Sequence, residues 1–534
     1  MSIGTRFAKD AGLVMVLILA SRLLGFFRER AIADVFGLSI ETDIFRLAFN
    51  IPDLMYYLLI AGGFNAAFIP VFSGYLARGE EDEGWRLTAT FLSVVVALLA
   101  LMVVLGIAFA PQLSPLVAYS YRGDERELLV RLMRLMFPAV FFTALAGAGM
   151  GIHRSYKNFA PPMWGPILYN AFIIASTYLL GEELGVVGMA YGTVAGAIAN
   201  FLLQVPFIWR KSRGKRLSID LSHPGLQQVL KLMGPAVVSL SIYQVNFIVS
   251  SNLASGLAEG SPTALRVAQT IVQLPLGVFG MGIGMVILPS LSGLAARGER
   301  DAFREMFSQS IRTVFFITIP SAVGLAVLRH PIVRLLFETG QFDAADTEMA
   351  AFALLFFTAG VWAQAGVQVL TQVYYAMQET KTLVRVSVTA LVLNTLLSLL
   401  FVRFTPLGHG GLALASSITV IVNLLNYLFN LRAKIGSIDG RSIARSTLSA
   451  GLASLIMSVV VYWTDRGTEG LFGASTQGEL FHLLLVISVG VAVYALAAWT
   501  LRIPELHLVL EMAARPKHPP QRRGGGDEGA GLGG

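Results

Sequence analysis

The 534-residue sequence contains no cysteine, which excludes disulfides and thiolate metal sites. Charged residues are also scarce, because they make up 14% of this chain and about 25% of ordinary soluble proteins. Hydrophobic residues account for 55%, and the mean hydropathy is +0.67. A chain this apolar is predicted to be an all-α polytopic membrane protein.

Basic residues exceed acidic ones and give a net charge of +7. They lie in short connections between apolar runs, where the bias of membrane proteins toward cytoplasmic cations explains them. The sequence has no basic face with interleaved aromatic residues, so we expect no nucleic-acid partner.

Apolar runs of spanning length recur along the chain. A helix needs roughly 20 residues to cross about 30 Å of hydrocarbon. Fourteen runs approach or exceed this length, which predicts about 14 transmembrane helices. They lie near residues 9–27, 43–75, 88–112, 131–152, 160–180, 187–208, 227–255, 263–293, 306–328, 348–375, 382–403, 411–432, 443–463 and 480–501.

The connections between these runs differ in charge. Those after even-numbered runs hold most of the cations, and the connection from Arg210 to Arg216 alone holds five. Those after odd-numbered runs hold far fewer and include acids such as Glu182 and Glu259. The positive-inside rule therefore places the even connections and both termini in the cytoplasm.

An internal repeat divides the chain into two similar parts. The segment Pro70-Val-Phe-Ser-Gly-Tyr-Leu-Ala-Arg-Gly-Glu80 reappears as Pro289-Ser-Leu-Ser-Gly-Leu-Ala-Ala-Arg-Gly-Glu299. Because each unit has six helices, an even number, both units enter the membrane from the same side as parallel repeats around a central cavity. The predicted parts are an N-terminal lobe at 1–210, a C-terminal lobe at 227–432, two additional helices at 443–503 and a disordered cytoplasmic tail at 513–534.

The second apolar run contains a stripe of polar residues. Their spacing of three and four places them on one helical face. A charge at the bilayer centre costs roughly 2.5 to 3.5 kcal/mol on insertion scales, so such a face usually lines a bundle interior or a wet cavity. The stripe consists of Asp43, Arg46, Asn50, Asp53 and Tyr57.

The repeat assigns a matching stripe to the eighth run, which contains Arg266, Gln269 and Gln273. Related by the repeat axis, the two stripes would face each other across the cavity. The alternative is that the second stripe only joins helices through hydrogen bonds. A series on the tenth run, Gln364, Gln368 and Gln372, fits either interpretation.

Several motifs resemble those of the MurJ (MviN) lipid II flippases, in the multidrug/oligosaccharidyl-lipid/polysaccharide exporter superfamily. The resemblance covers residues 1 to about 505. The motifs are Ser21-Arg-Leu-Leu-Gly-Phe-Phe-Arg-Glu29, Thr42-Asp43 with Phe49-Asn-Ile-Pro-Asp-Leu54, Gly62-Gly-Phe-Asn-Ala-Ala-Phe-Ile-Pro-Val71, and Pro275-Leu-Gly-Val-Phe-Gly280 with Val286-Ile-Leu-Pro-Ser-Leu291.

The resemblance implies a V-shaped, two-lobe transporter that works by alternating access. It implies flipping of lipid II, an undecaprenyl-diphosphate-linked muropeptide, from the inner to the outer leaflet of the bacterial cytoplasmic membrane for cell-wall synthesis. The last two helices would form a groove for the lipid tail. Such a protein is not an enzyme and needs no cofactor. Its implied partners are the lipid-linked precursor, membrane lipids and the cell-wall synthesis machinery.

By position, Arg22, Arg28, Glu29 and Asp43 match charged residues of the family. The chain departs from it at Tyr56 and Thr270, where the family often has functional arginines. Arginines bind phosphate bidentately and stay charged when partly desolvated, which suits a lipid diphosphate. The complete predicted substrate-binding set is Arg22, Arg28, Glu29, Asp43, Arg46, Asn50, Arg266, Gln269 and Gln273.

We predict no metal site beyond weak sodium-site candidates at Asn394 and Ser398. Some relatives have a carboxylate at the position of Ser398, and a neutral serine leaves such a site without a charged ligand.

Other functions stay open at this point. One is export of another polyprenyl-linked precursor or of drugs, and another is a scaffold without transport. A membrane glycosyltransferase or phosphatase would need a carboxylate-bound metal or an activated nucleophile, and the sequence shows no such constellation.

Overall fold

The computed structural model describes residues 3–212, 220–277, 281–472 and 475–508. Within these ranges the chain forms twenty helices and no strand, which confirms the predicted all-α class. The predicted tail at 513–534 and most of the basic connection after Ser212 lie outside the described residues.

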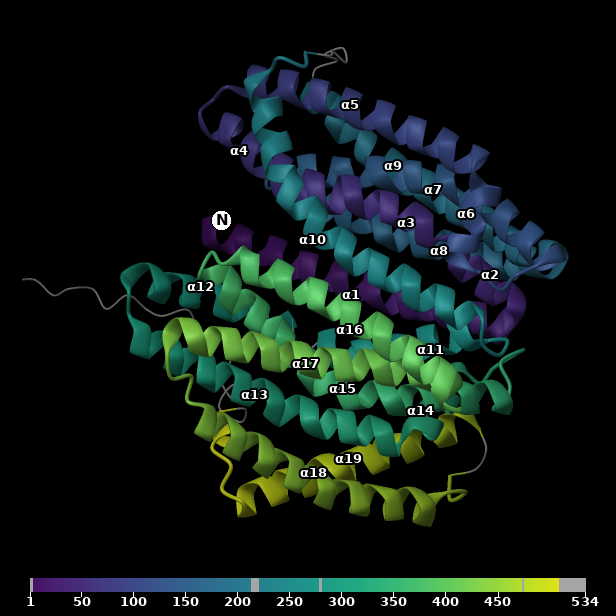
Figure 1. Cartoon of the computed structure of the whole chain (residues 1–534), viewed down its shortest axis with the longest axis vertical. Coiled ribbons are helices and arrows are strands. Elements are labelled where there is room, and N and C mark those ends of the chain that lie inside the picture. The colour runs from purple at the N-terminus through teal and green to yellow at the C-terminus, as the bar shows by residue number, and fades with distance from the viewer. Residues whose placement is uncertain (1–2, 213–219, 278–280, 473–474, 509–534) are drawn as a thin grey trace, which may run out of the picture.

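The first half of the chain forms one group of helices, drawn in purple and blue in Figure 1. Helix α1 packs along α8, and α7 packs along α9. The helices are α1 (Ile3–Phe36), α2 (Ile40–Ala48), α3 (Asn50–Tyr56), η1 (Tyr57–Phe68), α4 (Ile69–Ala77), α5 (Glu81–Ala108), α6 (Ala110–Val117), α7 (Gly123–Ser155), α8 (Ala160–Leu184) and α9 (Val186–Ser212).

The second half forms another group, drawn in teal, green and yellow, and α10 crosses from the first group to the second (Figure 1). Helix α10 packs against η1 in the first group and against α16 in the second. The helices are α10 (Pro224–Ser255), α11 (Ser261–Pro275), α12 (Met281–Arg297), α13 (Arg300–Val327), α14 (Arg329–Phe337), α15 (Ala344–Ala376), α16 (Thr380–Phe404), α17 (Gly408–Ile435), α18 (Gly440–Thr468) and α19 (Thr476–Thr500).

Ten helices of the described chain are long and apolar enough to span a membrane, which makes the protein a multi-pass membrane protein. The predicted runs 9–27, 43–75, 227–255 and 263–293 are not among them. The total of fourteen crossings therefore stays a prediction.

The second and eighth runs are not single straight helices. The second is divided into α2, α3, η1 and α4. Pro52 cannot donate a backbone hydrogen bond, and η1, which follows α3, is a π-helix, a form typical of functional sites. The eighth is divided at Pro275, where α11 ends. Both predicted polar stripes therefore lie on short helical pieces.

The last two helices pack on the second group. Helix α18 contacts α13 and α19. The Tyr494 hydroxyl of α19 donates to the Phe316 carbonyl oxygen of α13 at 2.6 Å. In membrane proteins such polar contacts help to fix neighbouring helices.

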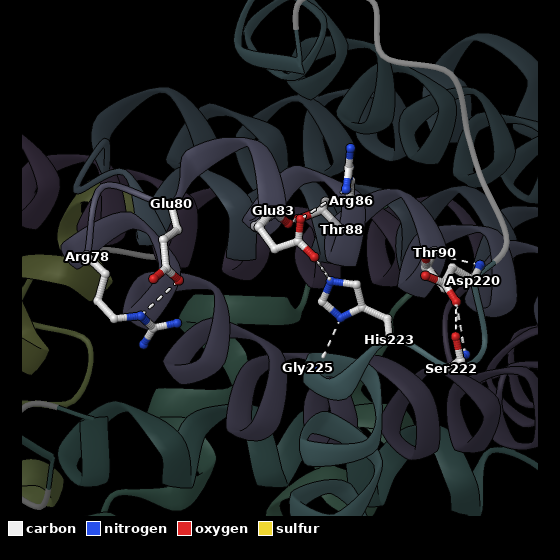
Figure 2. A network of polar contacts seen from close by, with 11 residues as sticks. Arg78, Glu80, Glu83, Arg86, Thr88, Thr90, Asp220, Ser222, His223 and Gly225 are labelled. Atoms are coloured by element: carbon white, nitrogen blue, oxygen red, sulfur yellow. Dashed lines mark hydrogen bonds and ion pairs between the residues drawn. The ribbon is translucent and has the colours of Figure 1, made fainter.

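One end of the molecule holds a polar network that joins the starts of α5 and α10 (Figure 2). His223 is buried, and its Nε2 lies 3.1 Å from Glu83 Oε1, while its Nδ1 accepts from the Gly225 amide. Nearby, hydrogen bonds from the Ser222 hydroxyl and amide hold the pKa of Asp220 below its ordinary value. These contacts attach the start of α10 to the first group. We name this the His223 end.

Candidate functional site

A cavity of about 1210 Å³ lies between the two groups of helices. Its walls come from α1, α2, α3, η1, α7 and α8 on one side and from α10, α11, α15, α16 and α17 on the other. Both predicted polar stripes reach it. The polar stripe and motif residues that line it include Arg28, Glu29, Arg46, Asn50, Asp53, Tyr57, Arg266, Gln269 and Gln273.

The Glu29 carboxylate is the centre of a cluster of charges in this cavity. Arg28 Nη2 lies 2.7 Å from Glu29 Oε1, and Arg46 Nη1 lies 2.7 Å from Oε2. Arg266 reaches the same carboxylate from the second group, with its Nε 3.8 Å from Oε1. Glu29 is only 3% exposed. Three arginines converge on one buried acid, so the cluster keeps an excess of positive charge.

This cluster has unused hydrogen-bond donors. Arg46 Nε and Nη2 are buried and have no hydrogen-bond partner within the described part of the chain. Arg28 is better satisfied, because its Nη1 donates to Asn170 Oδ1 at 3.1 Å. Buried charged donors without partners are costly unless a ligand or water satisfies them. The cluster can therefore accept an anionic group.

Arg22 and Asp43, two predicted site residues, are not among the residues that line the described cavity. Arg22 is exposed on α1 and packs against the second group at Gly277, where a Cβ atom would collide with Arg22 Nη1. Asp43 is almost fully buried at the contact between α2 and α11. The stripe therefore divides, because α2 places Asp43 at the junction and Arg46 at the cavity.

Asp43 binds the start of α11. Its carboxylate accepts from the Gly260 amide at 2.8 Å, the Thr263 amide at 2.9 Å and the Thr263 hydroxyl at 2.6 Å. An acid at a helix N-terminus satisfies free amides and interacts favourably with the helix dipole. Asp43 therefore joins the two groups by capping a helix that lies more than two hundred residues away.

Other contacts close the same end, which we name the Asp43 end. Glu259 Oε1 accepts from the Ile40 amide at 2.9 Å, and Asp346 Oδ2 accepts from the Leu38 amide at 3.0 Å. These bonds and those of Asp43 connect the first group to the second on one side of the cavity.

Glycine permits the close approach at this end. Gly260 has a positive φ of 81°, and a Cβ there would lie 2.7 Å from the Leu38 carbonyl oxygen. Gly340 has a φ of 58°, and a Cβ there would collide with the Asp34 carbonyl oxygen. Both the backbone conformation and the space exclude a side chain.

Sequence reasoning missed several cavity residues. Tyr169, Tyr375 and Tyr427 line the cavity, as does Tyr56. Nothing in their spacing marks them, because tyrosines are also common in helix packing. Asn170 was recognisable, since it recurs at Asn394 in the repeat, and it holds Arg28 in place.

The sodium-site candidates lie in the second group. Asn394 Oδ1 accepts from the Ser250 hydroxyl at 3.1 Å. Ser398 Oγ is buried and has no hydrogen-bond partner in the described chain. Within the described ranges, no group of three or more His, Cys, Asp or Glu side chains could hold a metal ion.

The all-helical fold and a charged cavity between two groups of helices define a multi-pass membrane protein of a transporter class. A solved multidrug resistance MATE family transporter of the MOP superfamily, in an inward-facing conformation, shares this fold. It is 17% identical, with a TM-score of 0.64 over 80% of this chain and 99% of that one.

The particular family follows from closer matches. The family model for the lipid II flippase MurJ matches residues 32–482, and the chain belongs to this family. A solved lipid II flippase MurJ in an inward closed conformation is similar with a TM-score of 0.76 and 25% identity, over 94% of this chain and 100% of that one.

Curated relatives carry the name of the same family. The lipid II flippase MurJ of Burkholderia cenocepacia is 29% identical over 453 residues, which cover 83% of this chain and 87% of the relative. The probable lipid II flippase MurJ of Vibrio cholerae is 28% identical over 511 residues, which cover 91% and 97%.

Proposed function

We propose that this protein flips lipid II, the undecaprenyl-diphosphate-linked precursor of peptidoglycan, from the inner to the outer leaflet of the bacterial cytoplasmic membrane. The observation that carries the proposal is the arginine cluster around Glu29, with the buried, unpaired donors of Arg46 in a large cavity. The family and the names of the relatives support the substrate.

The diphosphate of the lipid would bind at this cluster. Guanidinium groups bind phosphate oxygens through two parallel hydrogen bonds, and a site of reduced dielectric strengthens them. Glu29 holds the arginines while the cavity is empty, because unpaired charges there would be strongly unfavourable. A diphosphate brings more negative charge than Glu29 supplies, and it would use the free Nε and Nη2 of Arg46.

The remaining lining suits a sugar and peptide headgroup. Gln269 and Gln273 offer both donors and acceptors, and Tyr375 and Tyr427 offer hydroxyls with an apolar ring. We propose that these neutral residues contact the headgroup and that the charged cluster contacts the diphosphate. The substrate leaves the protein chemically unchanged, so the protein acts as a transporter and not as an enzyme.

The positive-inside pattern supports an orientation in which both termini and the His223 end face the cytoplasm. The contacts of Asp43 then seal the outer side, and the cavity is in an inward state. Residues 1–210 and 227–432 act as the two lobes of alternating access, and 443–503 forms the groove for the lipid tail.

Orientation is tested by cysteine labelling. Single cysteines at Ser212 and Ser475 of this cysteine-free chain should react with a membrane-impermeant thiol reagent from opposite sides. Reaction of both from the outside would contradict the orientation.

Substrate and activity are tested with the purified protein in proteoliposomes. Lipid II should move between leaflets faster than in protein-free vesicles and be recovered intact. Another polyprenyl-diphosphate saccharide serves as the comparison. Faster movement of that lipid than of lipid II would favour a different export substrate, and movement of neither would favour a scaffold.

A further inference from the structure

A second cluster of arginines lies on α7 at the Asp43 end. Arg126, Arg131 and Arg134 line a cleft of about 660 Å³, together with Glu127 and Tyr191. Among the described residues, the lining of this cleft and the lining of the central cavity share no member. The transport cycle proposed above therefore gives these three arginines no role.

Two of these arginines are held in place by hydrogen bonds to backbone carbonyl oxygens beside the cleft. Arg126 Nη2 donates to the Pro111 carbonyl oxygen at 2.8 Å. Arg134 Nε donates to the Ile107 carbonyl oxygen, near the end of α5, at 3.3 Å. Each guanidinium keeps further N–H groups for a ligand. Arg131 has no hydrogen-bond or ion-pair partner in the described part of the chain.

The cleft lies at the level of a lipid headgroup. Arg134 precedes Ser155, at the other end of α7, by 21 residues. At 1.5 Å per residue this separation is about 31 Å, which equals the thickness of the hydrocarbon core, about 30 Å. The hydroxyl of Tyr156, the residue after Ser155, donates a hydrogen bond to Glu81 at the start of α5. The Ser155 end of α7 therefore lies at the His223 end of the molecule.

The charge of the cleft departs from the positive-inside pattern. Its three arginines and one glutamate sum to +2, on a side where connections normally hold few cations. Ion pairs within the protein do not account for this excess positive charge, because Arg131 has no ion-pair partner in the described part of the chain.

The surroundings also suit an acyl chain. Val130 and Leu135 belong to the lining of the cleft. The neighbouring part of α5 exposes Leu101, Val104 and Leu105, which are 55%, 63% and 45% exposed. A ligand at this cleft would therefore have an anionic head beside the arginines and an apolar tail beside α5.

We propose that this cleft binds the phosphate headgroup of an anionic phospholipid of the outer leaflet. Arg131 and Arg134 lie one helical turn apart and grip the phosphate, and the Tyr191 hydroxyl supplies another hydrogen bond. The assignment to the outer leaflet rests on the orientation in the proposed function. A resident phospholipid fits better than the transported lipid, because the cleft is separate from the central cavity.

The full-length protein, purified in detergent, tests this proposal. The probes are phosphatidylglycerol, zwitterionic phosphatidylcholine and undecaprenyl diphosphate, with bound lipid counted by native mass spectrometry. The double variant Arg131→Ala, Arg134→Ala should weaken phosphatidylglycerol binding about thirtyfold, and Arg131→Ala alone about fivefold, since each cation near an anionic surface contributes comparably. Phosphatidylcholine binding should stay the same.

Arg131 makes no hydrogen bond or ion pair within the described chain, so Arg131→Ala removes no such contact from the fold. A loss of phosphatidylglycerol binding in this variant therefore reports the loss of the cation. Arg403→Ala, at the Asp43 end of α16 and outside the cleft, is the matched control and should leave phosphatidylglycerol binding unchanged. Equal losses in this control, or none in the Arg131 variants, would overturn the proposal. The proposal would also be overturned if the Arg131 variants lost more binding of undecaprenyl diphosphate than of phosphatidylglycerol. That result would assign the cleft to the transported lipid.

Transport is measured separately with the same variants. Weakened phosphatidylglycerol binding with lipid II flipping intact supports the cleft and leaves the proposed function standing. Failure of the parent protein to flip lipid II would count against the proposed function and not against the cleft.

Discussion

Arg46 Nη1 on α2 lies 2.7 Å from Glu29 Oε2 on α1, although the two residues are seventeen positions apart and a turn lies between their helices. Arg28, next to Glu29 in sequence, binds the other oxygen of the same carboxylate. One acid therefore determines the position of two arginines from two different helices. This arrangement yields the first prediction.

Glu29→Gln should destabilise the protein by about 3 to 5 kcal/mol, the usual effect of removing one partner from a buried charge pair. The substitution keeps the size of the side chain and leaves Arg28 and Arg46 without their counter-charge. Denaturant or thermal unfolding in detergent measures the change. Glu80→Gln is the control, because Glu80 pairs with Arg78 on an exposed surface, where such pairs contribute about 0 to 1 kcal/mol. Equal stability of the two variants would show that the cluster is not structural.

Arg28→Ala and Arg266→Ala should each reduce lipid II flipping at least about tenfold, since hydrogen bonds to charged groups contribute about 1.5 to 3 kcal/mol. Lysine at either position should restore little activity, because it lacks the planar fork of arginine. Proteoliposome flipping measures the rate, and membrane levels show that the variants fold. Full activity of Arg28→Ala combined with Arg266→Ala would refute the central-cavity site.

Asp43→Asn should open the Asp43 end. The variant loses the charge in three hydrogen bonds to α11, which weakens the contact between the two groups. A cysteine at Thr371, in the cavity wall, reports the change. A membrane-impermeant thiol reagent added outside should label it at least about tenfold faster in the variant than in the parent.

The control for this opening is Glu348→Gln at the same end, whose partner His330 belongs to the same group of helices. Gly260→Ala should act like Asp43→Asn, because the new Cβ would meet the Leu38 carbonyl oxygen. Unchanged labelling in both Asp43→Asn and Gly260→Ala would show that these contacts do not close the cavity.

Transport should depend on membrane potential more than on sodium. Asn394 and Ser398 supply neutral oxygens only, and the Asn394 oxygen already accepts from Ser250. Flipping in vesicles with a clamped potential should therefore persist when potassium replaces sodium. A collapse of transport on that replacement would establish sodium coupling.

The sequence supported most conclusions that depend on local pattern. Apolar runs predicted the all-α class, because a segment in hydrocarbon must satisfy its own backbone hydrogen bonds. The repeat matched Arg266, Gln269 and Gln273 to the first stripe, and these residues do line the same cavity as Arg46 and Asn50. Helical spacing was sufficient there, because residues three and four apart share a face.

Helical spacing failed for Asp43. Asp43 and Arg46 both lie on α2, three residues apart, so spacing places them on one face. It does not predict that Asp43, one turn nearer the start of the helix, binds the start of α11 while Arg46 reaches the cavity. Arg22 lies away from the Glu29 cluster for a different reason. Its six-residue offset from Arg28 turns it about 120° around α1, toward Gly277.

The sequence by itself determined that this chain is a helical membrane protein with an internal sequence repeat and with charged residues that need a polar environment. Hydropathy and periodicity are local properties, and the bilayer acts on each segment separately. Only the tertiary structure decided that Glu29 holds three arginines and that Asp43 caps α11. Those pairings join residues as many as 237 positions apart, from Glu29 to Arg266, and depend on how the two groups pack, which no local pattern encodes.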